Sequence, residues 1–261
     1  MNILAVDIGN TSTSFGYFRD GCLKKTCHMK IGGRPRGASI RLEKLRGIIP
    51  MKQMDAAVIA SVVPNTTRIL KKALLRQCGL KTLEAGKDFS IPIKNCYKKP
   101  KQVGVDRLLN AAAGFDQFKK SLILIDFGTA ITFDVVTKKG DYLGGAIAPG
   151  IEISLEALYR KTALLPKIRL AQPKNVIGRN TIESIRSGCS FGIAGLCERM
   201  VHEIKTKLGI RPLVIATGGY ARFISKYLRI IDRIDPYLTL KGILLSYESF
   251  LKKKRLTKKS Y

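Results

Sequence analysis

Residues 3–18, ILAVDIGNTSTSFGYF, contain the pattern on which the fold prediction rests. An apolar run from Ile3 to Val6 ends in the polar stretch Asp7-Ile8-Gly9-Asn10-Thr11, and a run with aromatic residues follows from Ser14 to Phe18. Short apolar runs separated by Gly, Asn and Asp are typical of β-strands joined by a turn. The stretch therefore predicts a strand, a polar turn and a second strand.

A second copy of this pattern occupies residues 122–136, LILIDFGTAITFDVV. The apolar run Leu122–Ile125 ends in Asp126-Phe127-Gly128-Thr129, and a further apolar run follows from Ile131 to Val136. A pattern that recurs far along the chain indicates an internal duplication. We therefore predict two similar lobes, residues 1–112 and 113–261. Two unrelated Asp-x-Gly turns that happen to follow strands are the alternative interpretation.

Strands and helices alternate around the two copies. The stretch Ala56–Val63 predicts a strand that ends at Pro64, and Asn65 is the expected N-cap of the helix that follows. Helical spacing of apolar residues covers 65–78, 105–118, 181–208 and 238–251. This alternation predicts a layered α/β fold with mixed sheets.

Composition places the chain among globular proteins with a strong basic excess. Its 261 residues are 45% hydrophobic, and 47 Lys and Arg against 19 Asp and Glu give a formal charge of +28. Such a charge attracts anionic partners such as nucleotides. A generally cationic surface is the simpler explanation of the basic excess. A dedicated nucleic-acid surface is the alternative, although aromatic residues that could stack on bases are sparse in the basic segments.

The remaining composition argues against metal-cluster and membrane classes. Six cysteines form no CxxC pair and only two histidines accompany them, so we expect no zinc site and reduced thiols. No basic segment precedes the first apolar run, and no apolar stretch is long enough to span a bilayer. We therefore expect a soluble cytoplasmic protein with no membrane partner.

The turn after the first strand has the chemistry of a phosphate cradle. Gly9 lets the backbone approach a ligand closely, and the Thr and Ser hydroxyls together with backbone N–H groups can donate to phosphate oxygens. The carboxylate of Asp7 can hold Mg²⁺ directly or through water. An ordinary hairpin with Asn and Ser as turn formers is the alternative.

The second copy supplies a matching turn in the other lobe. Asp126 offers a carboxylate at a strand end for a cation, and Thr129 offers a hydroxyl for phosphate. The glycine-rich segments Gly144–Gly150 and Thr217-Gly218-Gly219 provide backbone that could lie against a nucleotide. Phosphoryl transfer depends mainly on positioning and charge neutralisation, which two such turns can supply.

A candidate general base stands at the expected start of the helix over 105–118. Asp106 and Arg107 follow Gly104-Val105, so Asp106 could accept the proton of a substrate hydroxyl while Arg107 binds an anionic group. Asp106 could instead be an acidic residue that is favourable at a helix N-terminus. The residues alone thus indicate a kinase without naming its substrate.

Taken in order, these segments resemble the type III pantothenate kinase family. The resemblance covers essentially the whole chain and rests on DIGNTSTS at Asp7, SVVP at Ser61, Tyr97-x-x-Pro100, GVDR at Gly104, DFGTAITFD at Asp126, GGAIAPG at Gly144, GRNT at Gly178 and TGG at Thr217. It implies the two-lobed actin-like ATPase (ribonuclease-H-like) fold with duplicated mixed-sheet domains. It also implies a homodimer that phosphorylates pantothenate with ATP in the first step of coenzyme A synthesis.

The resemblance also implies roles for individual residues. ATP would be bound by Asp7, Ile8, Gly9, Asn10, Thr11, Ser12, Thr13, Ser14 and Thr129. Asp126 would bind an activating monovalent cation, K⁺ or NH₄⁺, and Asp106 would be the base. Pantothenate would contact Tyr97, Gly104, Val105, Asp106, Arg107 and Thr181.

Some features fit this assignment less directly. Thr181 alone predicts the N-cap of the following helix, and Val105 stands where the family is expected to have a smaller alanine. A kinase of the same fold with another acceptor, and a catalytically idle relative that acts as a transcription accessory factor, are the rival interpretations. Loss of Asp7, Asp106 or Asp126 would favour the idle relative, and all three are present.

Overall fold

The computed structural model describes residues 1–30, 45 and 47–258. It forms two compact units: unit 1 contains Met1–Gln117 and Leu238–Tyr261, and unit 2 contains Phe118–Tyr237. The sequence predicts that the closing helix belongs to the second lobe, whereas the structure groups it with the first. Unit 2 is therefore an insertion in the chain of unit 1.

Unit 1 is built on a five-stranded mixed sheet in the order β3-β2-β1-β4-β5. Its strands are β1 (Asn2–Ile8), β2 (Ser12–Arg19), β3 (Cys22–Lys30), β4 (Ala56–Ser61) and β5 (Thr82–Glu84). The first three are antiparallel neighbours, while β4 runs parallel to β1. Pairs such as Leu4 with Tyr17 and Val6 with Phe15 hold the β1–β2 hairpin in register.

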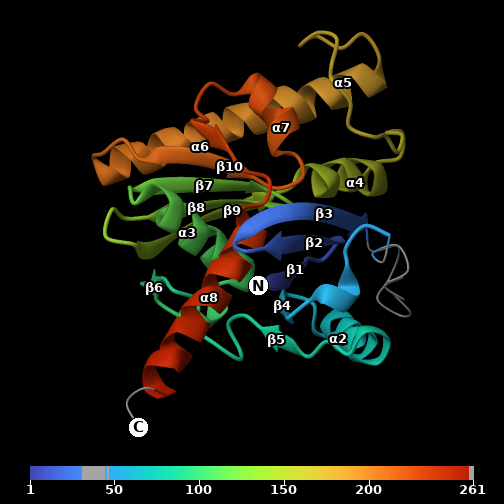
Figure 1. The fold of residues 1–261 in the computed structure, drawn as a ribbon. Helices are drawn as coiled ribbons and strands as arrows, with labels where there is room; N and C mark the ends of the chain where they lie inside the picture. The colour runs from blue at the N-terminus through green and yellow to red at the C-terminus, as the bar shows by residue number, and fades with distance from the viewer. Residues whose placement is uncertain (31–44, 46, 259–261) are drawn as a thin grey trace. The chain divides into compact units, whose positions relative to one another are not determined.

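Alternate residues of β1 enter two different cores on the two faces of this sheet. Leu4, Val6 and Ile8 pack with buried residues of helix α2 (Pro64–Cys78), among them Leu70 and Leu74. On the other face, Ile3 and Ala5 belong to a cluster with Leu240, Ile243 and Leu244 of helix α8 (Leu238–Lys258). Strand side chains point alternately to opposite faces, which explains the division. This second core explains why the closing helix, drawn in red in Figure 1, joins unit 1.

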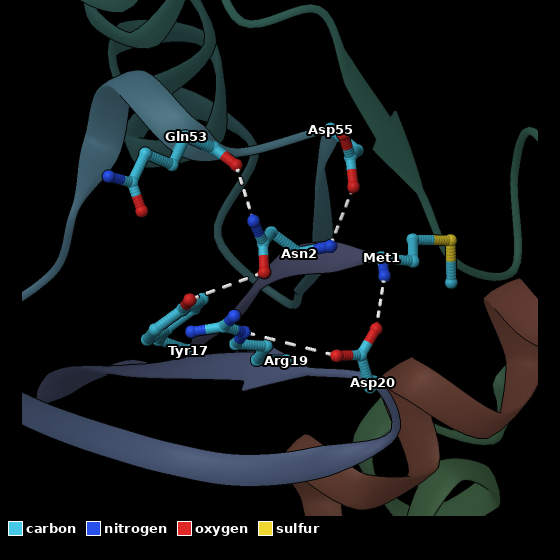
Figure 2. A network of polar contacts seen from close by, with 7 residues as sticks. All are labelled: Met1, Asn2, Tyr17, Arg19, Asp20, Gln53 and Asp55. Atoms are coloured by element: carbon cyan, nitrogen blue, oxygen red, sulfur yellow. Dashed lines mark hydrogen bonds and ion pairs between the residues drawn. The ribbon is translucent and has the colours of Figure 1, made fainter.

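Polar contacts fix the amino end of β1, at the opposite end of the strand from Asp7 (Figure 2). The backbone N–H of Asn2 donates to a carboxylate oxygen of Asp55 at 2.6 Å, and the Asn2 amide donates to the carbonyl of Gln53 at 2.9 Å. The Tyr17 hydroxyl donates to Asn2 Oδ1 at 3.2 Å. The network ties β1 to both β2 and the segment before β4, and so helps to set the register that places Asp7.

Helices of unit 1 agree with the sequence prediction except at their ends. Helix α3 (Val105–Phe118) has the predicted bounds. Helix α2 begins at Pro64 with Val63 as N-cap, so the prediction that Asn65 caps it is wrong. Proline is favoured in the first turn of a helix because its missing N–H has no partner to lose there. Helix α8 continues to Lys258, beyond the predicted end at residue 251. The 3-10 turns Met51–Gln53 and Pro100–Gln102 and the short strand β6 (Lys94–Asn95) complete the described elements of the first segment.

Unit 2 repeats the strand plan of unit 1. Its strands β11-β10-β7-β8-β9 are neighbours in that order, with bounds β7 (Leu122–Phe127), β8 (Ala130–Val136), β9 (Asp141–Pro149), β10 (Leu213–Thr217) and β11 (Arg233–Ile234). Strands β7, β8 and β9 are antiparallel neighbours, and β10 runs parallel to β7 as β4 does to β1. The predicted duplication of mixed sheets is thus confirmed.

Helices of unit 2 follow its strands. They are α4 (Ile151–Lys161), α5 (Thr181–Ser187), α6 (Ile193–Leu208) and α7 (Ala221–Ile224), with a 3-10 turn at Ser225–Tyr227. The predicted single helix over 181–208 is interrupted by the π-helical segment Gly188–Gly192 between α5 and α6. Glycine is a poor helix former, and a glycine stands at each end of that segment. Among the described residues, no helix is both long and apolar enough to cross a bilayer.

Candidate active site

The β1–β2 turn distributes its polar side chains over two faces of the sheet. Asp7 pairs opposite Ser14, and Ile8 pairs opposite Thr13. Directly opposed residues in an antiparallel pair share a face. Asp7 and Ser14 are partly exposed, whereas Ile8 is fully buried. Thr13 is 2% exposed, and its Oγ1 has no hydrogen-bond partner among the residues that the structure describes. The side chains of Asp7 and Ser14 are therefore the accessible ones, and Ile8 and Thr13 offer a ligand mainly their backbone.

The tip of this turn is tight and exposed. The Gly9 N–H donates to the Ser12 carbonyl at 2.9 Å, which leaves Asn10 and Thr11 exposed at the tip. Asp7 lies beside Ala60 at the carboxyl end of the parallel β1–β4 pair. Ligands of α/β sheets commonly bind at the carboxyl ends of parallel strands. The location of the turn suits a phosphate-binding site.

Asp106 lies in the first turn of α3, and its carboxylate turns back toward the backbone at the start of the helix. Its Oδ1 accepts a hydrogen bond from the Arg107 N–H at 2.9 Å. A Cβ on Gly104 would lie 2.4 Å from that same Oδ1, so a side chain at position 104 would displace the carboxylate. Glycine at 104 therefore permits the observed position of the candidate base. Arg107 itself is only 7% exposed, less than expected for a residue that binds an anionic substrate group.

Helix α3 is held in place by α8. A Cβ on Gly242 would lie 2.3 Å from the Leu109 carbonyl oxygen, so glycine allows the two helices to approach closely. The Thr239 hydroxyl also donates to Asn110 Oδ1 at 2.8 Å. Leu109 shares the core cluster of Ile3 and Ala5, on the same face of the sheet as Asp7. This packing brings the start of α3 to the face that carries Asp7.

The segment with Tyr97 is ordered by one asparagine. Asn95 Oδ1 accepts from the Tyr97 N–H at 3.0 Å, and the Asn95 amide donates to the Pro100 carbonyl at 3.2 Å. Tyr97 is partly exposed, and Val105 packs against the second core of unit 1. The structure thus gives the Tyr97–Pro100 motif a defined loop conformation.

In unit 2, three segments distant in sequence meet around Asp126. Thr217 of β10 lies beside Asp126 of β7, and a Cβ on Gly218 would lie 2.3 Å from Asp126 Oδ1. A Cβ on Gly150 would lie 2.1 Å from the Thr129 carbonyl oxygen. Glycines at 150 and 218 therefore allow the end of β9 and the turn after β10 to close around the Asp126–Thr129 turn. The three motifs that the sequence analysis treated separately form one cradle.

A partly buried hydrogen bond links this cradle to α4. The Tyr220 hydroxyl donates to a carboxylate oxygen of Glu152 at 2.7 Å, and the Tyr220 N–H donates to the Phe127 carbonyl at 3.2 Å. Burial, together with the bond to Glu152, raises the pKa of Tyr220 well above its usual value. Tyr220 therefore stays protonated and donates throughout the physiological pH range. Tyr220 directly follows the TGG motif, but no sequence pattern indicated a role for it.

Thr181 is the first residue of α5 and is not its N-cap. Asn180 caps the helix, since its side chain accepts a hydrogen bond from the Glu183 N–H at 2.9 Å. Asparagine is among the best N-cap residues, and it precedes Thr181 directly. The alternative role predicted for Thr181 is therefore wrong, and its exposed side chain is available for a ligand.

The predicted site residues are divided between the units. Unit 1 carries the Asp7–Ser14 turn, Tyr97 and the Gly104–Arg107 segment, and unit 2 carries Asp126, Thr129 and Thr181. Within the described ranges, no three His, Cys, Asp or Glu residues gather as a metal cage. A carboxylate at the end of β1, and another cradled by glycine at the end of β7, suit cations that complete their coordination with water and phosphate.

A pocket of about 250 Å³ in unit 1 lies apart from these predicted residues. It is lined by Asp88, Phe89, Ser90, Ser249, Phe250 and Lys253. None of the residues predicted to bind nucleotide or pantothenate contributes to it.

No sequence pattern indicated a functional role for β3 either. In the structure, His28 of that strand pairs opposite Ser14, and its Nδ1 lies 3.1 Å from the Ser14 Oγ. The available signal was the alternation of side chains along this strand, which lies at the edge of the sheet, and that alternation becomes informative only once the register is known.

Comparisons with known proteins agree with the motifs. A sequence model of the type III pantothenate kinase family matches residues 3–203. The type III pantothenate kinase of Persephonella marina is 44% identical over 247 residues, which cover 92% of this chain and 96% of that protein.

Solved structures support the fold at low sequence identity. A Baf family transcriptional activator from Campylobacter jejuni has a TM-score of 0.59 at 18% identity, covering 95% of this chain and 99% of that one. Component A of (R)-2-hydroxyglutaryl-CoA dehydratase from Acidaminococcus fermentans has a TM-score of 0.54 at 12% identity, covering 94% and 96%. These likenesses show the two-lobed actin-like ATPase fold predicted from the sequence. Since the family model matches most of the chain and the bacterial kinase is similar over nearly all of it, this protein belongs to the type III pantothenate kinase family.

Proposed function

We propose that this chain transfers the γ-phosphoryl group of ATP to pantothenate, giving 4′-phosphopantothenate in the first step of coenzyme A biosynthesis. Membership of the family supports this activity. The observation that carries it is the cradle in which Gly150 and Gly218 close around the Asp126–Thr129 turn, together with the duplicate turn at Asp7. Two carboxylate-bearing turns with hydroxyl groups offer the charge balance and positioning that phosphoryl transfer requires.

The Asp7–Ser14 turn and Thr129 bind ATP in this proposal. Exposed hydroxyls and backbone N–H groups of the turn donate to phosphate oxygens. Asp7 holds Mg²⁺ through water, and the ion, when bound, neutralises charge on the phosphates. The residues fit this task because Asp7 is partly exposed at a strand end, beside the small Ala60.

Asp126 holds an activating monovalent cation, K⁺ or NH₄⁺. A Cβ on Gly218 would lie 2.3 Å from Asp126 Oδ1, so the glycine leaves that side of the carboxylate free of a side chain at position 218. We expect Asp126→Ala to weaken the dependence of kcat on K⁺, measured by replacing KCl with a large organic cation at constant ionic strength. Full K⁺ activation in that variant would remove Asp126 from the cation site.

Asp106 acts as the general base. The pantothenate hydroxyl oxygen attacks the γ-phosphorus, the bond to the bridging oxygen of ADP breaks, and the hydroxyl proton passes to the Asp106 carboxylate. Tyr97, Gly104, Val105, Arg107 and Thr181 contact pantothenate. The hydrogen bond from the Arg107 N–H and the close approach of Gly104 support this role, because they hold the Asp106 carboxylate at a defined position at the helix start.

The test is ADP release with pantothenate, ATP, Mg²⁺ and K⁺ against a control without pantothenate. Asp106→Asn should lower kcat by roughly 10² to 10⁴ while leaving the unfolding midpoint unchanged. Asp116→Asn, on the exposed part of the same helix, is the matched control and should retain activity. Pantothenate-dependent release that persists in the Asp106 variant would exclude it as the base. No pantothenate-dependent release from folded wild type would reject the proposed acceptor.

We further propose that the enzyme acts in the cytoplasm as a homodimer. Size-exclusion chromatography with light scattering measures the molar mass in solution and so tests the dimer. Likeness to the Campylobacter protein shows a shared fold alone and does not favour a transcriptional role.

A further inference from the structure

Strand β3 contributes two bases to the sheet face that carries Asp7. His28 pairs opposite Ser14, Lys30 pairs opposite Ser12, and Ser14 pairs opposite Asp7 on β1. Residues directly opposite in antiparallel pairs place their side chains on the same face, about 5 Å apart at Cβ. Asp7, Ser14 and His28 therefore form a row across three strands, with Ser12 and Lys30 beside it.

The packing of the residues next to His28 and Lys30 gives independent evidence for the face on which these two side chains lie. Cys27 and Met29, which alternate with the two bases along β3, pack against the core under α2. Side chains alternate along a strand, so His28 and Lys30 point to the opposite face. Both are exposed, and they lie at the end of β3 that adjoins the Asp7–Ser14 turn.

The contact between His28 and Ser14 affects what the hydroxyl can do. Nδ1 of His28 and Oγ of Ser14 lie 3.1 Å apart, and the tautomer of the ring decides which of them donates. When Nδ1 carries the proton it donates to Ser14 Oγ, and the Ser14 proton remains available to another acceptor. A phosphate oxygen placed over the turn is such an acceptor.

Charge favours the same ligand. Asp7 alone would repel a triphosphate, whereas an ammonium on the same face offsets that repulsion and can form a charge-assisted hydrogen bond. We propose that Lys30 binds a β- or γ-phosphate oxygen of ATP and that His28 is a positioning residue which orients the Ser14 hydroxyl toward the same phosphates. This inference rests on the proposed role of the Asp7–Ser14 turn in binding ATP.

Binding of ATP, ADP and AMP without pantothenate tests the role of Lys30. We expect Lys30→Ala to raise the Kd of Mg-ATP roughly tenfold in calorimetry, as loss of a hydrogen bond to a charged group does. The Kd of AMP should change by less than about twofold, because AMP lacks the β- and γ-phosphates. Lys25→Ala is the matched control: it removes the same charge from the same strand, but Lys25 pairs opposite Tyr17, whose side chain lies on the other face.

Equal weakening by Lys30→Ala and Lys25→Ala would show a general charge effect and overturn the proposal. Equal weakening of ATP and AMP would place the contact away from the β- and γ-phosphates and would also overturn it. An unchanged Kd for ATP in Lys30→Ala would do the same.

Double variants test the positioning role of His28. If His28 acts through Ser14, then His28→Ala and Ser14→Ala should each weaken ATP binding several-fold, and the double variant should be no weaker than Ser14→Ala. His28→Gln, whose amide can donate to Ser14, should retain most of the affinity. Additive losses, or equal losses in His28→Gln and His28→Ala, would refute the positioning role.

These binding measurements separate the inference from the proposed function. Wild type that binds ATP but fails to phosphorylate pantothenate would reject the function and leave the inference standing. Normal turnover with unchanged ATP affinity in the β3 variants would reject the inference alone. Wild type that binds no ATP would reject both.

Discussion

Replacing Gly218 by alanine should damage the Asp126 cradle more than any other single methyl addition to the turn after β10. Gly218 has a φ of +88°, and a Cβ there would lie 2.3 Å from Asp126 Oδ1, 2.7 Å from the Phe127 carbonyl carbon and 2.8 Å from the Phe127 nitrogen. All three separations fall below 3.0 Å, a distance that Cβ contacts in proteins essentially never reach. The Asp126 side chain could rotate away, but the Phe127 backbone is held in a strand between β8 and β10.

The magnitude follows from two contributions. Left-handed backbone costs a residue with a Cβ about 1–2 kcal/mol. Forcing a methyl group into a filled site adds about 1–3 kcal/mol. We therefore expect Gly218→Ala to lower the free energy of unfolding by about 2–5 kcal/mol and, because Asp126 must move, to lower kcat as well.

Urea unfolding followed by circular dichroism, together with ADP release at saturating substrate, measures both effects. Gly219→Ala is the control, since a Cβ there has no atom within 4 Å and no left-handed φ. It should change the free energy of unfolding by less than about 1 kcal/mol. A Gly218→Ala protein with the unfolding midpoint and kcat of wild type would refute the cradle geometry.

Two further predictions concern polar contacts, one buried and one partly exposed. Tyr142→Phe removes the hydroxyl that donates to Asp134 Oδ1 at 2.7 Å. Because Asp134 is only 1% exposed, the free energy of unfolding should fall by about 1–3 kcal/mol. An unchanged midpoint of urea unfolding would contradict this prediction. Burial alone would raise the pKa of Glu84, but hydrogen bonds from Lys71 and Lys87 outweigh it, so the folded pKa lies below the unfolded value of about 4.5. The stability that Glu84 contributes is therefore complete above the unfolded pKa and is lost as pH falls through the lower folded pKa. Glu84→Gln should therefore lower the free energy of unfolding by about 1 kcal/mol at pH 7, and the difference from wild type should shrink in acid; a difference as large at pH 3 would contradict the sign.

Much of the fold could be predicted because its local signals are strong. The recurrence of an apolar run, Asp-x-Gly and a second run marked both hairpins, and apolar spacing gave the bounds of α3 correctly. These features depend on neighbours in sequence, which is why periodicity and turn residues identify them.

The features that sequence missed depend on tertiary contacts or on competition between adjacent residues. Helix α8 joins unit 1 because Leu240 and Ile243 complete a core with Ile3 and Ala5, and no local pattern reveals that partner. Asn180 and Thr181 are both good N-cap residues, so composition could not decide which of them caps α5. The position of His28 opposite Ser14 required the register of β2 and β3.

The insertion of unit 2 between α3 and α8 has a consequence for biogenesis. Unit 2 is a continuous segment, residues 118–237, and all of it is synthesised before α8. Unit 1 cannot bury Ile3 and Ala5 until α8 arrives to supply Leu240, Ile243 and Leu244. The sheet that is made first is therefore completed last. Until then one apolar face of the sheet lacks the side chains that α8 supplies, and a ribosome that stalls within unit 2 leaves the core on that face incomplete.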